Sequence, residues 1–477
     1  MDRPKQLKLA LVPADQEMKQ QAQQARERLA RWAWSEAAVW TNRMLKALEE
    51  GVQGGKWFRL IDKVYARDNL RAAWRKVEAN RGAAGVDGQT VQAFALHAEQ
   101  YLEKLAHELR ENKYHPLDVR RQWIPQPGSN EKRPLGIPAV RDRVVQTALR
   151  AVLEPIFERE FAEQSYGFRP KRSCKDALTR VDALLQAGYT WVVDADLKSY
   201  FDTIPHEALL ARVRERVADG RVLQLIEAFL KAHILDGLHE WTPEAGSPQG
   251  AVVSPLLSNV YLNPLDQLMA RRGFEMIRYA DDFVVLCRNE TEAQQALKAV
   301  QEWTAQAGLQ LHPQKTRITA VTSGPYWKAE GFDFLGFRMT RGAKVPRAKS
   351  IQKFHDTIRA RTPRCNGVCM VEIINRVNRS VRGWFNYFRA SEAEPFARLD
   401  QMIRRRLRAI LSKRMKKKGQ GRGWANMRWP NAFFKKLGLL SLLKLRAEYH
   451  QSLRGTHSLE SRMRENRLSG SVGGGTW

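Results

Sequence analysis

The tetrapeptide Tyr279-Ala280-Asp281-Asp282 constrains the fold of this chain most, because it places two adjacent carboxylates between two short apolar runs. The runs at 274–278 and 283–287 contain large and β-branched residues, a pattern that predicts a β-hairpin whose second strand is buried. Side chains alternate across a strand, so only one of the two aspartates can point squarely at a shared metal ion, and we assign that role to Asp281. An ordinary turn is the alternative, because Asp readily adopts turn conformations.

A second acidic cluster follows an apolar run earlier in the chain. Residues 191–196, Trp-Val-Val-Asp-Ala-Asp, predict a short strand that ends at Asp196. If the two strands are neighbours in one sheet, Asp196 and Asp281 can share two divalent cations about 3.5–4 Å apart, the arrangement for in-line displacement at phosphorus. Asp282 completes the candidate catalytic acids. We expect Asp194 and Asp202 to lie outside the metal set, as outward-facing polar residues or helix caps.

The chemistry of these ligands favours Mg²⁺ over Zn²⁺, because carboxylate oxygens and bound phosphate suit a hard cation. Mn²⁺ is the expected substitute. The four cysteines are too few and too scattered for a disulfide framework. Cys365 and Cys369 have the spacing of half a zinc site, but the sequence offers no second pair or nearby His to complete it, so two ordinary thiols are the simpler interpretation.

The net charge of the chain indicates a polyanionic partner. The 477 residues carry a formal charge of +29 and a pI near 10.2, while 43% of them are hydrophobic, as in a folded protein. Nucleic acid, held largely through its phosphates, is the leading candidate. No run of about 18 apolar residues predicts a membrane span, and no cleavable leader follows Met1, so we expect a soluble intracellular protein.

The chain changes character twice along its length. Residues 1–60 show helical spacing up to the Gly-rich segment 51–55, and helical and β-rich stretches then alternate to about residue 339. Beyond residue 341 the helical patterns are long and basic, and 412–422 contains no acid. The aromatic residues interspersed there favour a nucleic-acid face over a merely solvated one, because bases stack on aromatic rings.

Eight motif blocks occur in the order typical of one family. The sequence resembles the group II intron-encoded reverse transcriptase and maturase family, in the form without a C-terminal HNH endonuclease domain. The segment at 378–388 is similar to the maturase, or thumb, domain of that family. The blocks are 66–70 with 80–88, 132–138, 165–170, 191–196, 246–250 with 254–259, 279–282, 311–316 and 334–337.

The resemblance implies an α+β right-hand polymerase, with fingers, a palm with an antiparallel sheet, a helical thumb and a basic C-terminal helical region. It implies a helical N-terminal extension (1–60), fingers (61–190), a palm with the catalytic aspartates (191–345), a thumb or maturase domain (346–412), a basic nucleic-acid-binding region (413–460) and a disordered tail (461–477). The implied activity is RNA-directed DNA synthesis from dNTPs in the bacterial cytoplasm or nucleoid. The implied partners are template and intron RNA and primer or target DNA, in splicing and retrohoming of a mobile element.

The resemblance also implies residue roles. The metal ligands are Asp196, Leu197 and Asp281. Phe201 matches an aromatic gate that meets a ribose 2′-hydroxyl, with a core Phe as the alternative, and Gln249 lies in the loop that lines the incoming nucleotide. The triphosphate-binding residues are Arg120 and Arg133, with Lys315 near the leaving pyrophosphate. The expected nucleic-acid contacts are Arg379, Arg382, Trp384, Arg404, Arg405, Lys416, Lys417 and Lys418.

Two departures from the family matter. Gln126 stands where a triphosphate-binding Lys is common, which removes one charged contact unless Lys132 compensates. No paired-Cys motif follows the Lys-rich run, so we expect this chain not to cut a second DNA strand. Two other functions stay open, namely a splicing cofactor with vestigial polymerase activity and an intron-free reverse transcriptase recruited to defence or repair. The sequence leaves the oligomeric state and the role of the N-terminal extension open.

Overall fold

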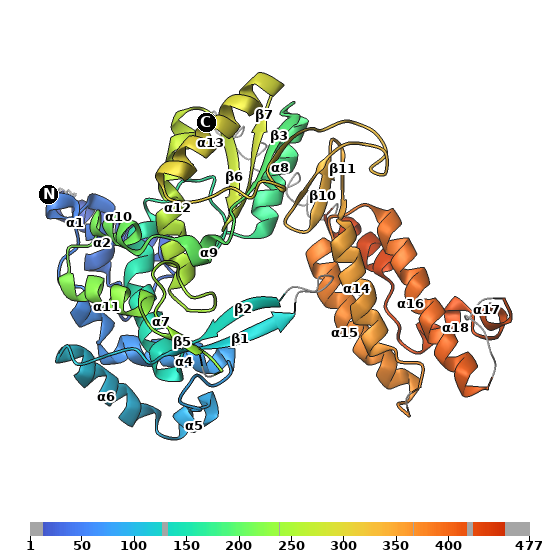
Figure 1. Ribbon diagram of the computed structural model, residues 1–477, viewed down its shortest axis with the longest axis horizontal. Coiled ribbons are helices and arrows are strands. Elements are labelled where there is room, and N and C mark those ends of the chain that lie inside the picture. The colour runs from blue at the N-terminus through green and yellow to red at the C-terminus, as the bar shows by residue number, and fades with distance from the viewer. Residues whose placement is uncertain (1–12, 126–131, 238, 366, 417–422, 454–477) are drawn as a thin grey trace, which may run out of the picture. The chain divides into compact units, whose positions relative to one another are not determined.

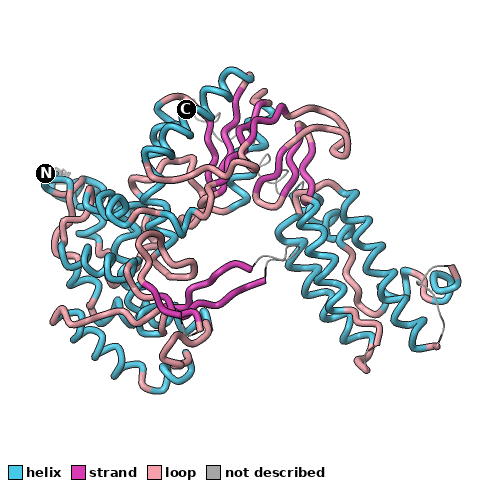
Figure 2. Tube along the Cα trace, in the orientation of Figure 1, coloured by secondary structure: helices cyan, strands magenta, loops and turns pink. Residues whose placement is uncertain are grey.

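The computed structural model describes residues 13–125, 132–237, 239–365, 367–416 and 423–453 (Figures 1 and 2). The chain divides into two compact units, residues 1–318 and 319–477. We describe each unit by itself. Within the described ranges, no helix combines the length and the apolar character that crossing a membrane requires.

The N-terminal extension is helical and packs into the core of the first unit. Trp40 is 2% exposed and its ring N–H donates to the carbonyl of Ala151 at 2.9 Å. The described part of the extension is helical, its bounds at 1–60 stay a prediction, and of its two open roles the structure favours a packing arm. The helices of this part are α1 (Pro13–Arg31), α2 (Asn42–Glu50), η1 (Gln53–Gly55), α3 (Ile61–Val64), α4 (Arg67–Asn80), α5 (Val91–Leu96), α6 (Ala98–Arg110) and α7 (Val140–Glu158).

A first four-stranded sheet follows in the order β2-β1-β4-β5. Its long hairpin joins β1 (Val119–Pro125) and β2 (Lys132–Ile137), and the short strands β4 (Ile234–Asp236) and β5 (His239–Trp241) extend it along β1. Alternation along β1 separates Arg120 from Arg121 onto opposite faces of the sheet. This separation decides which arginine reaches the site described below.

The second sheet carries the predicted acids. Its order is β6-β7-β3-β8, from β6 (Glu275–Tyr279), β7 (Asp282–Cys287), β3 (Trp191–Asp196) and β8 (Arg317–Ala320). The predicted hairpin and its buried second strand are confirmed, because β7 is buried at every residue after Asp282. Helices α8 (Cys174–Gln186), α12 (Ser254–Arg271) and α13 (Glu290–Gln306) pack against this sheet. Helices α9 (Tyr200–Thr203), α10 (His206–Arg214) and α11 (Gly220–Leu230) connect it to the first sheet.

The second unit combines a small sheet with basic helices. Strands β9 (Phe332–Phe334), β10 (Phe337–Thr340) and β11 (Ala343–Pro346) form the sheet, in the order β11-β10-β9. The helices are α14 (Ala348–Arg361), α15 (Met370–Phe388), α16 (Ala393–Arg414), α17 (Trp424–Arg428) and α18 (Asn431–Lys436). The small sheet belongs to this unit, because the chain divides at residue 318. This division lies before residue 345, where we expect the palm to end. The palm boundary at 345 stays a prediction.

We predict that Trp40→Ala destabilises the first unit by about 3–5 kcal/mol, because it removes a large buried ring and leaves a cavity. Chemical unfolding followed by circular dichroism measures this change. Phe58→Ala is the matched control, because Phe58 is 62% exposed in the same unit. Equal stability of the two variants would contradict docking of the N-terminal extension.

Candidate active site

The tight turn between β6 and β7 meets the end of β3 at one edge of the second sheet. Strands β3 and β7 pair antiparallel, and the register places Asp196 opposite Asp282. Tyr279 pairs with Asp282 across the hairpin, so Ala280 and Asp281 form the turn. The conditional prediction that the two acidic strands are neighbours is therefore confirmed. Residues directly opposite each other in such a pair lie on the same face, which brings Asp196 beside the turn.

The environment of Asp281 suits a bound cation. Burial raises the pKa of Asp281 above its ordinary value, and the negative charge of Asp196 raises it further. The positive charges of Arg133 and Arg278 oppose this rise. Two carboxylates that repel each other in a partly buried place gain stability when a cation lies between them. The donor chemistry of the site thus fits a hard divalent metal ion.

A fully buried arginine fixes the catalytic turn from below. Arg278 donates through Nε and Nη2 to the two carboxylate oxygens of Asp266, at 2.8 and 2.5 Å. Its Nη1 donates to Asn259 Oδ1 at 2.9 Å and to the carbonyl of Ala280 at 2.8 Å, and Nη2 donates to Ser165 Oγ at 2.8 Å. Five hydrogen bonds on one guanidinium satisfy a charge that would otherwise be costly to bury.

A close backbone approach explains one of the sequence blocks. A Cβ on Gly167 would lie 2.2 Å from the amide nitrogen of Ala280, inside any allowed contact distance. Asn259 donates to the carbonyl of Gly167 at 2.8 Å and so links this segment to the Arg278 network. Ala280 has a φ of 62°, a left-handed conformation that a non-Gly residue keeps only when its surroundings enforce it. The 165–170 block therefore buttresses the turn.

The segment after α13 lies along the end of β3. Lys315 places its Nζ 2.6 Å from Asp196 Oδ2, and His312 donates its amide to the carbonyl of Asp196 at 2.7 Å. The side chain of Leu197 is buried and carries no donor atom, so Leu197 can serve a metal ion only through its main-chain carbonyl because that is its one available oxygen. Asp194 faces Arg317 at 3.4 Å, which agrees with its expected place outside the metal set.

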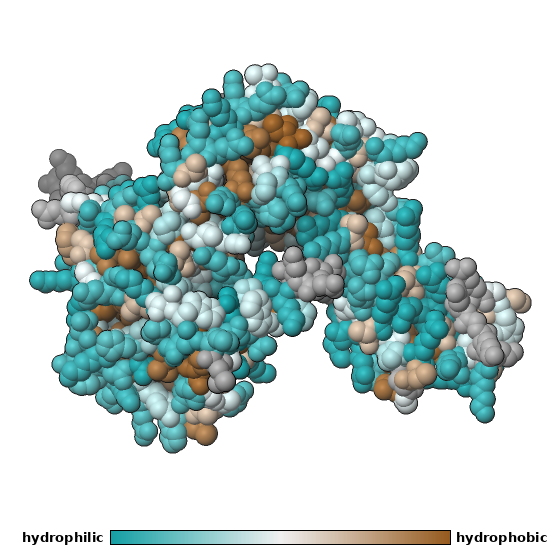
Figure 3. Space-filling model, viewed as in Figure 1, coloured by the Kyte–Doolittle hydropathy of each residue, from teal (hydrophilic) through white to brown (hydrophobic). Residues whose placement is uncertain are grey.

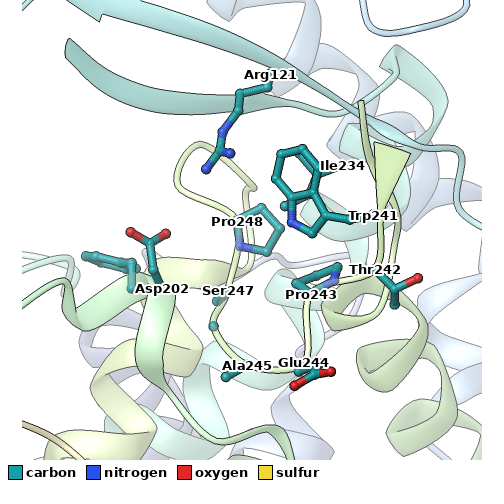
Figure 4. Close-up of a pocket in the computed structure, with 12 residues that line it drawn as sticks. Arg121, Asp202, Ile234, Trp241, Thr242, Pro243, Glu244, Ala245, Ser247 and Pro248 are labelled. Atoms are coloured by element: carbon teal, nitrogen blue, oxygen red, sulfur yellow. The ribbon is translucent and has the colours of Figure 1, made fainter. Parts of the chain in front are cut away.

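Phe201 lines a cavity of about 450 Å³, whose other walls come from the first sheet, from Asp202 and from the segment 242–248 (Figure 4). The amide of Ser247 donates to the carbonyl of Phe201 at 2.6 Å, which holds the loop at 246–250 against α9. Arg121 and Asp202 both point toward this cavity (Figure 4). Burial raises the pKa of Asp202, and the nearby Arg121 opposes the rise. Gln249 belongs to this loop, and its carbonyl accepts from the amide of Gly136 at 2.6 Å.

The two predicted triphosphate arginines occupy different environments. Arg133 is exposed on β2, and its positive charge opposes the rise that burial causes in the pKa of Asp281. It is therefore close enough to the acids to bind a phosphate group there. Arg120 instead donates to the carbonyl of Ala84 at 2.7 Å. The structure thus brings Arg121, and not Arg120, to the cavity beside Phe201. Gln126 lies outside the described residues.

The predicted nucleic-acid contacts differ in exposure. Trp384 packs against Phe354, Phe388 and Phe396, with ring centroids 4.6–5.8 Å apart. These contacts give Trp384 a packing role between the helices of the second unit, and because its side chain is only half-buried, its contact with nucleic acid stays a prediction. The remaining predicted contacts are exposed at Arg379, Arg382, Arg405 and Lys416, and half-buried at Arg404, while Lys417 and Lys418 lie outside the described residues.

Comparison with known proteins identifies the family. Residues 124–339 match the family model for reverse transcriptase (RNA-dependent DNA polymerase), and residues 351–429 match the maturase-specific domain of group II introns. Protein YkfC of Escherichia coli (strain K12) is 34% identical over 357 residues, which cover 66% of this chain and 87% of YkfC. The chain belongs to the group II intron-encoded reverse transcriptase and maturase family.

A second curated relative agrees with this placement. The group II intron-encoded protein LtrA of Lactococcus lactis subsp. cremoris is 36% identical over 219 residues, 44% of this chain but only 36% of LtrA. A solved partial Cas6-RT-Cas1--Cas2 complex matches 52% of this chain and 41% of that chain, with 25% identity and a TM-score of 0.34, too low to support an argument. The matched domains identify this family member as an RNA-directed DNA polymerase with a maturase domain, which binds RNA and DNA and depends on divalent metal ions.

Sequence reasoning did not single out three residues of this site. Arg278 was detectable, because a charged residue inside an apolar strand needs a buried partner. Gly167 lies in the motif block 165–170, but the motif does not reveal its role, and Arg121 gave no signal, since the importance of both arises from contacts with segments distant in the chain.

We predict that Gly167→Ala reduces primer extension by about 10²-fold. The added Cβ would collide with the backbone of Ala280 and displace the turn, and a displacement of about 1 Å is enough for such a loss. Gly220→Ala is the matched control, because a Cβ there meets no atom within 4 Å. Full activity of the Gly167→Ala protein would show that the turn tolerates the displacement.

Proposed function

We propose that Asp196, Asp281 and Asp282 carry out nucleotidyl transfer in this reverse transcriptase, on a template RNA with a DNA primer. The observation that supports this proposal most is the β3–β7 register, which sets Asp196 beside the tight turn. The carboxylates lie at the edge of a rigid sheet, and the buried Arg278 holds the turn from beneath. Such a preorganised site stabilises charge that develops during the reaction.

The proposed metal ion is Mg²⁺, held by Asp196, Asp281 and the carbonyl of Leu197. Among the described residues, no group of three or more His, Cys, Asp or Glu side chains is arranged to hold a metal ion by itself. This fits Mg²⁺, which proteins commonly bind through one or two carboxylates together with substrate phosphates. When bound, Mg²⁺ lowers the pKa of the attacking hydroxyl and neutralises charge on the leaving pyrophosphate.

The surrounding side chains suggest how the nucleotide is held. The exposed Arg133 is placed to bind triphosphate oxygens, since a guanidinium donates to phosphate in a fork. Lys315, beside Asp196, is placed to neutralise or protonate the leaving pyrophosphate. Phe201 and Gln249 line the sugar, with Phe201 excluding a 2′-hydroxyl.

The proposed biological role is splicing and retrohoming of a group II intron. The exposed predicted contacts Arg379, Arg382, Arg405 and Lys416 supply phosphate contacts for intron RNA, and the polymerase copies that RNA from a primer on target DNA. A net charge of +29 supports both tasks, because phosphate contacts supply much of the affinity for nucleic acid. We place this activity in the bacterial cytoplasm or nucleoid.

Asp281→Ala should reduce Mg²⁺-dependent primer extension on RNA by at least about 10³-fold, since it removes several kcal/mol of charge stabilisation. RNA affinity should stay unchanged, because it arises from distributed Lys and Arg contacts. Asp62→Ala is the control, because Asp62 is a half-exposed acid far along the chain from the turn. Extension by neither the wild-type protein nor the variant, with tight RNA binding by both, would favour a splicing cofactor.

Phe201→Ala should increase incorporation of ribonucleotides relative to deoxynucleotides by about 10–200-fold, the range for one steric contact in a pocket. Competition between rNTPs and dNTPs in primer extension measures this ratio. Trp241→Ala is the control, because Trp241 lines the same cavity from the first sheet. Equal sugar selectivity in the two variants would remove Phe201 from the gate role.

A further inference from the structure

A basic cavity opens on the helices of the second unit, apart from the catalytic turn. Its volume is about 360 Å³, and the surface over these helices is predominantly hydrophilic (Figure 3). The wall comes from α14, from the segment that follows α14, and from α16. The residues that line it are His355, Arg359, Arg364, Met402, Arg405, Arg406 and Ala409.

Positive charge in this cavity exceeds its neutralisation by acids. Four guanidiniums and one imidazole line the wall, and the carboxylate that pairs with them among the described residues is that of Asp356, 3.0 Å from Arg359 Nη1. Burial lowers the pKa of His355, and the charges of Arg359 and Arg405 lower it further. Such repulsion among like charges opposes folding unless an anion relieves it.

One arginine fixes the geometry of the wall. Arg406 donates through Nε to Thr362 Oγ1 at 2.7 Å and through Nη2 to the Thr362 carbonyl at 2.9 Å. Thr362 caps the carboxyl end of α14, where a cation also interacts favourably with the helix dipole. Arg406 therefore ties α16 to α14, whereas Arg359 and Arg405 are exposed.

We propose that this cavity, the thumb basic pocket, binds phosphate groups of an RNA backbone. The inference rests on the proposed RNA-binding function and assigns part of it to one place. A guanidinium donates two parallel hydrogen bonds to a phosphate group. Several guanidiniums on one fixed wall therefore suit a ligand with successive phosphates better than a ligand with a single carboxylate. Free phosphate shares this chemistry, so the experiment must separate it from RNA.

The test compares two double variants that remove equal charge. Arg359→Gln/Arg405→Gln removes two cations of the pocket. Arg376→Gln/Arg398→Gln removes two exposed cations that pair with Glu372 and Glu394 on their own helices. Fluorescence anisotropy measures the affinity of full-length protein for an RNA hairpin at several salt concentrations. Thermal unfolding checks that both variants fold.

We expect the pocket variant to lower the slope of log K against log salt by about 1–2, since each phosphate contact contributes about 0.7–0.9. The control variant should keep the wild-type slope. Arg359→Lys/Arg405→Lys should keep the slope but weaken binding, because lysine retains the charge without the fork. Indistinguishable slopes for the pocket and control variants would overturn the proposal.

Two further measurements distinguish RNA from a free anion and the pocket from the catalytic site. At equal ionic strength, inorganic phosphate should displace RNA from the wild-type protein no more than chloride does. If phosphate displaces RNA more than chloride from the wild-type protein but not from the pocket variant, and the two proteins have the same salt slope, the pocket binds a free anion instead. The Asp281→Ala protein should keep the wild-type salt slope, because the substitution removes a catalytic acid and no cation of the pocket. Failure of the wild-type protein both to extend a primer and to bind RNA would instead overturn the proposed function.

Discussion

The ion pair between Arg278 and Asp266 is the interaction on which the catalytic site depends. Both side chains are fully buried, and breaking such a pair typically costs about 3–5 kcal/mol, because the remaining charge stays buried without a partner. The pair joins β6 to α12, and the other donors of Arg278 reach the turn and the segment at Ser165. A single guanidinium thereby fixes three chain segments beneath the aspartates, which also explains why Gly167 must approach the turn so closely.

The buried network of Arg278 beneath the turn differs from the polar cavity beside Phe201, where the charged group lies against aromatic rings. There the backbone of Ser247 holds Phe201, while Arg121 lies over the rings of Trp123 and Trp241, with its Cζ 5.0 and 4.8 Å from their centroids. Cation–π contacts of this kind orient a guanidinium without neutralising it. The site thus combines acids on a rigid sheet with cationic groups on an adjacent hairpin. Both kinds of group can stabilise the charge that develops during nucleotidyl transfer.

In the second unit, the aromatic residues that pack the helices and the arginines proposed to bind phosphate lie on the same three helices. Trp384 and its three phenylalanine neighbours fill the space between α14, α15 and α16, whereas Arg379, Arg382 and Arg405 are exposed on the same helices. Sequence reasoning counted aromatic and basic residues together as one nucleic-acid signal. Helical periodicity places them on different faces, so the aromatic cluster stabilises the fold and the arginines remain available to phosphate.

The sequence by itself determined the hairpin, the strand that ends at Asp196 and the family, because these depend on local apolar patterning and on motifs of short span. It also predicted the helical extension, though not the packing of Trp40. Only the tertiary structure decided that Asp196 lies opposite Asp282, that Arg121 rather than Arg120 faces the cavity, and that Trp384 is a packing residue. Those outcomes depend on strand order, sheet face and contacts between segments far apart in the chain, which local patterns do not specify.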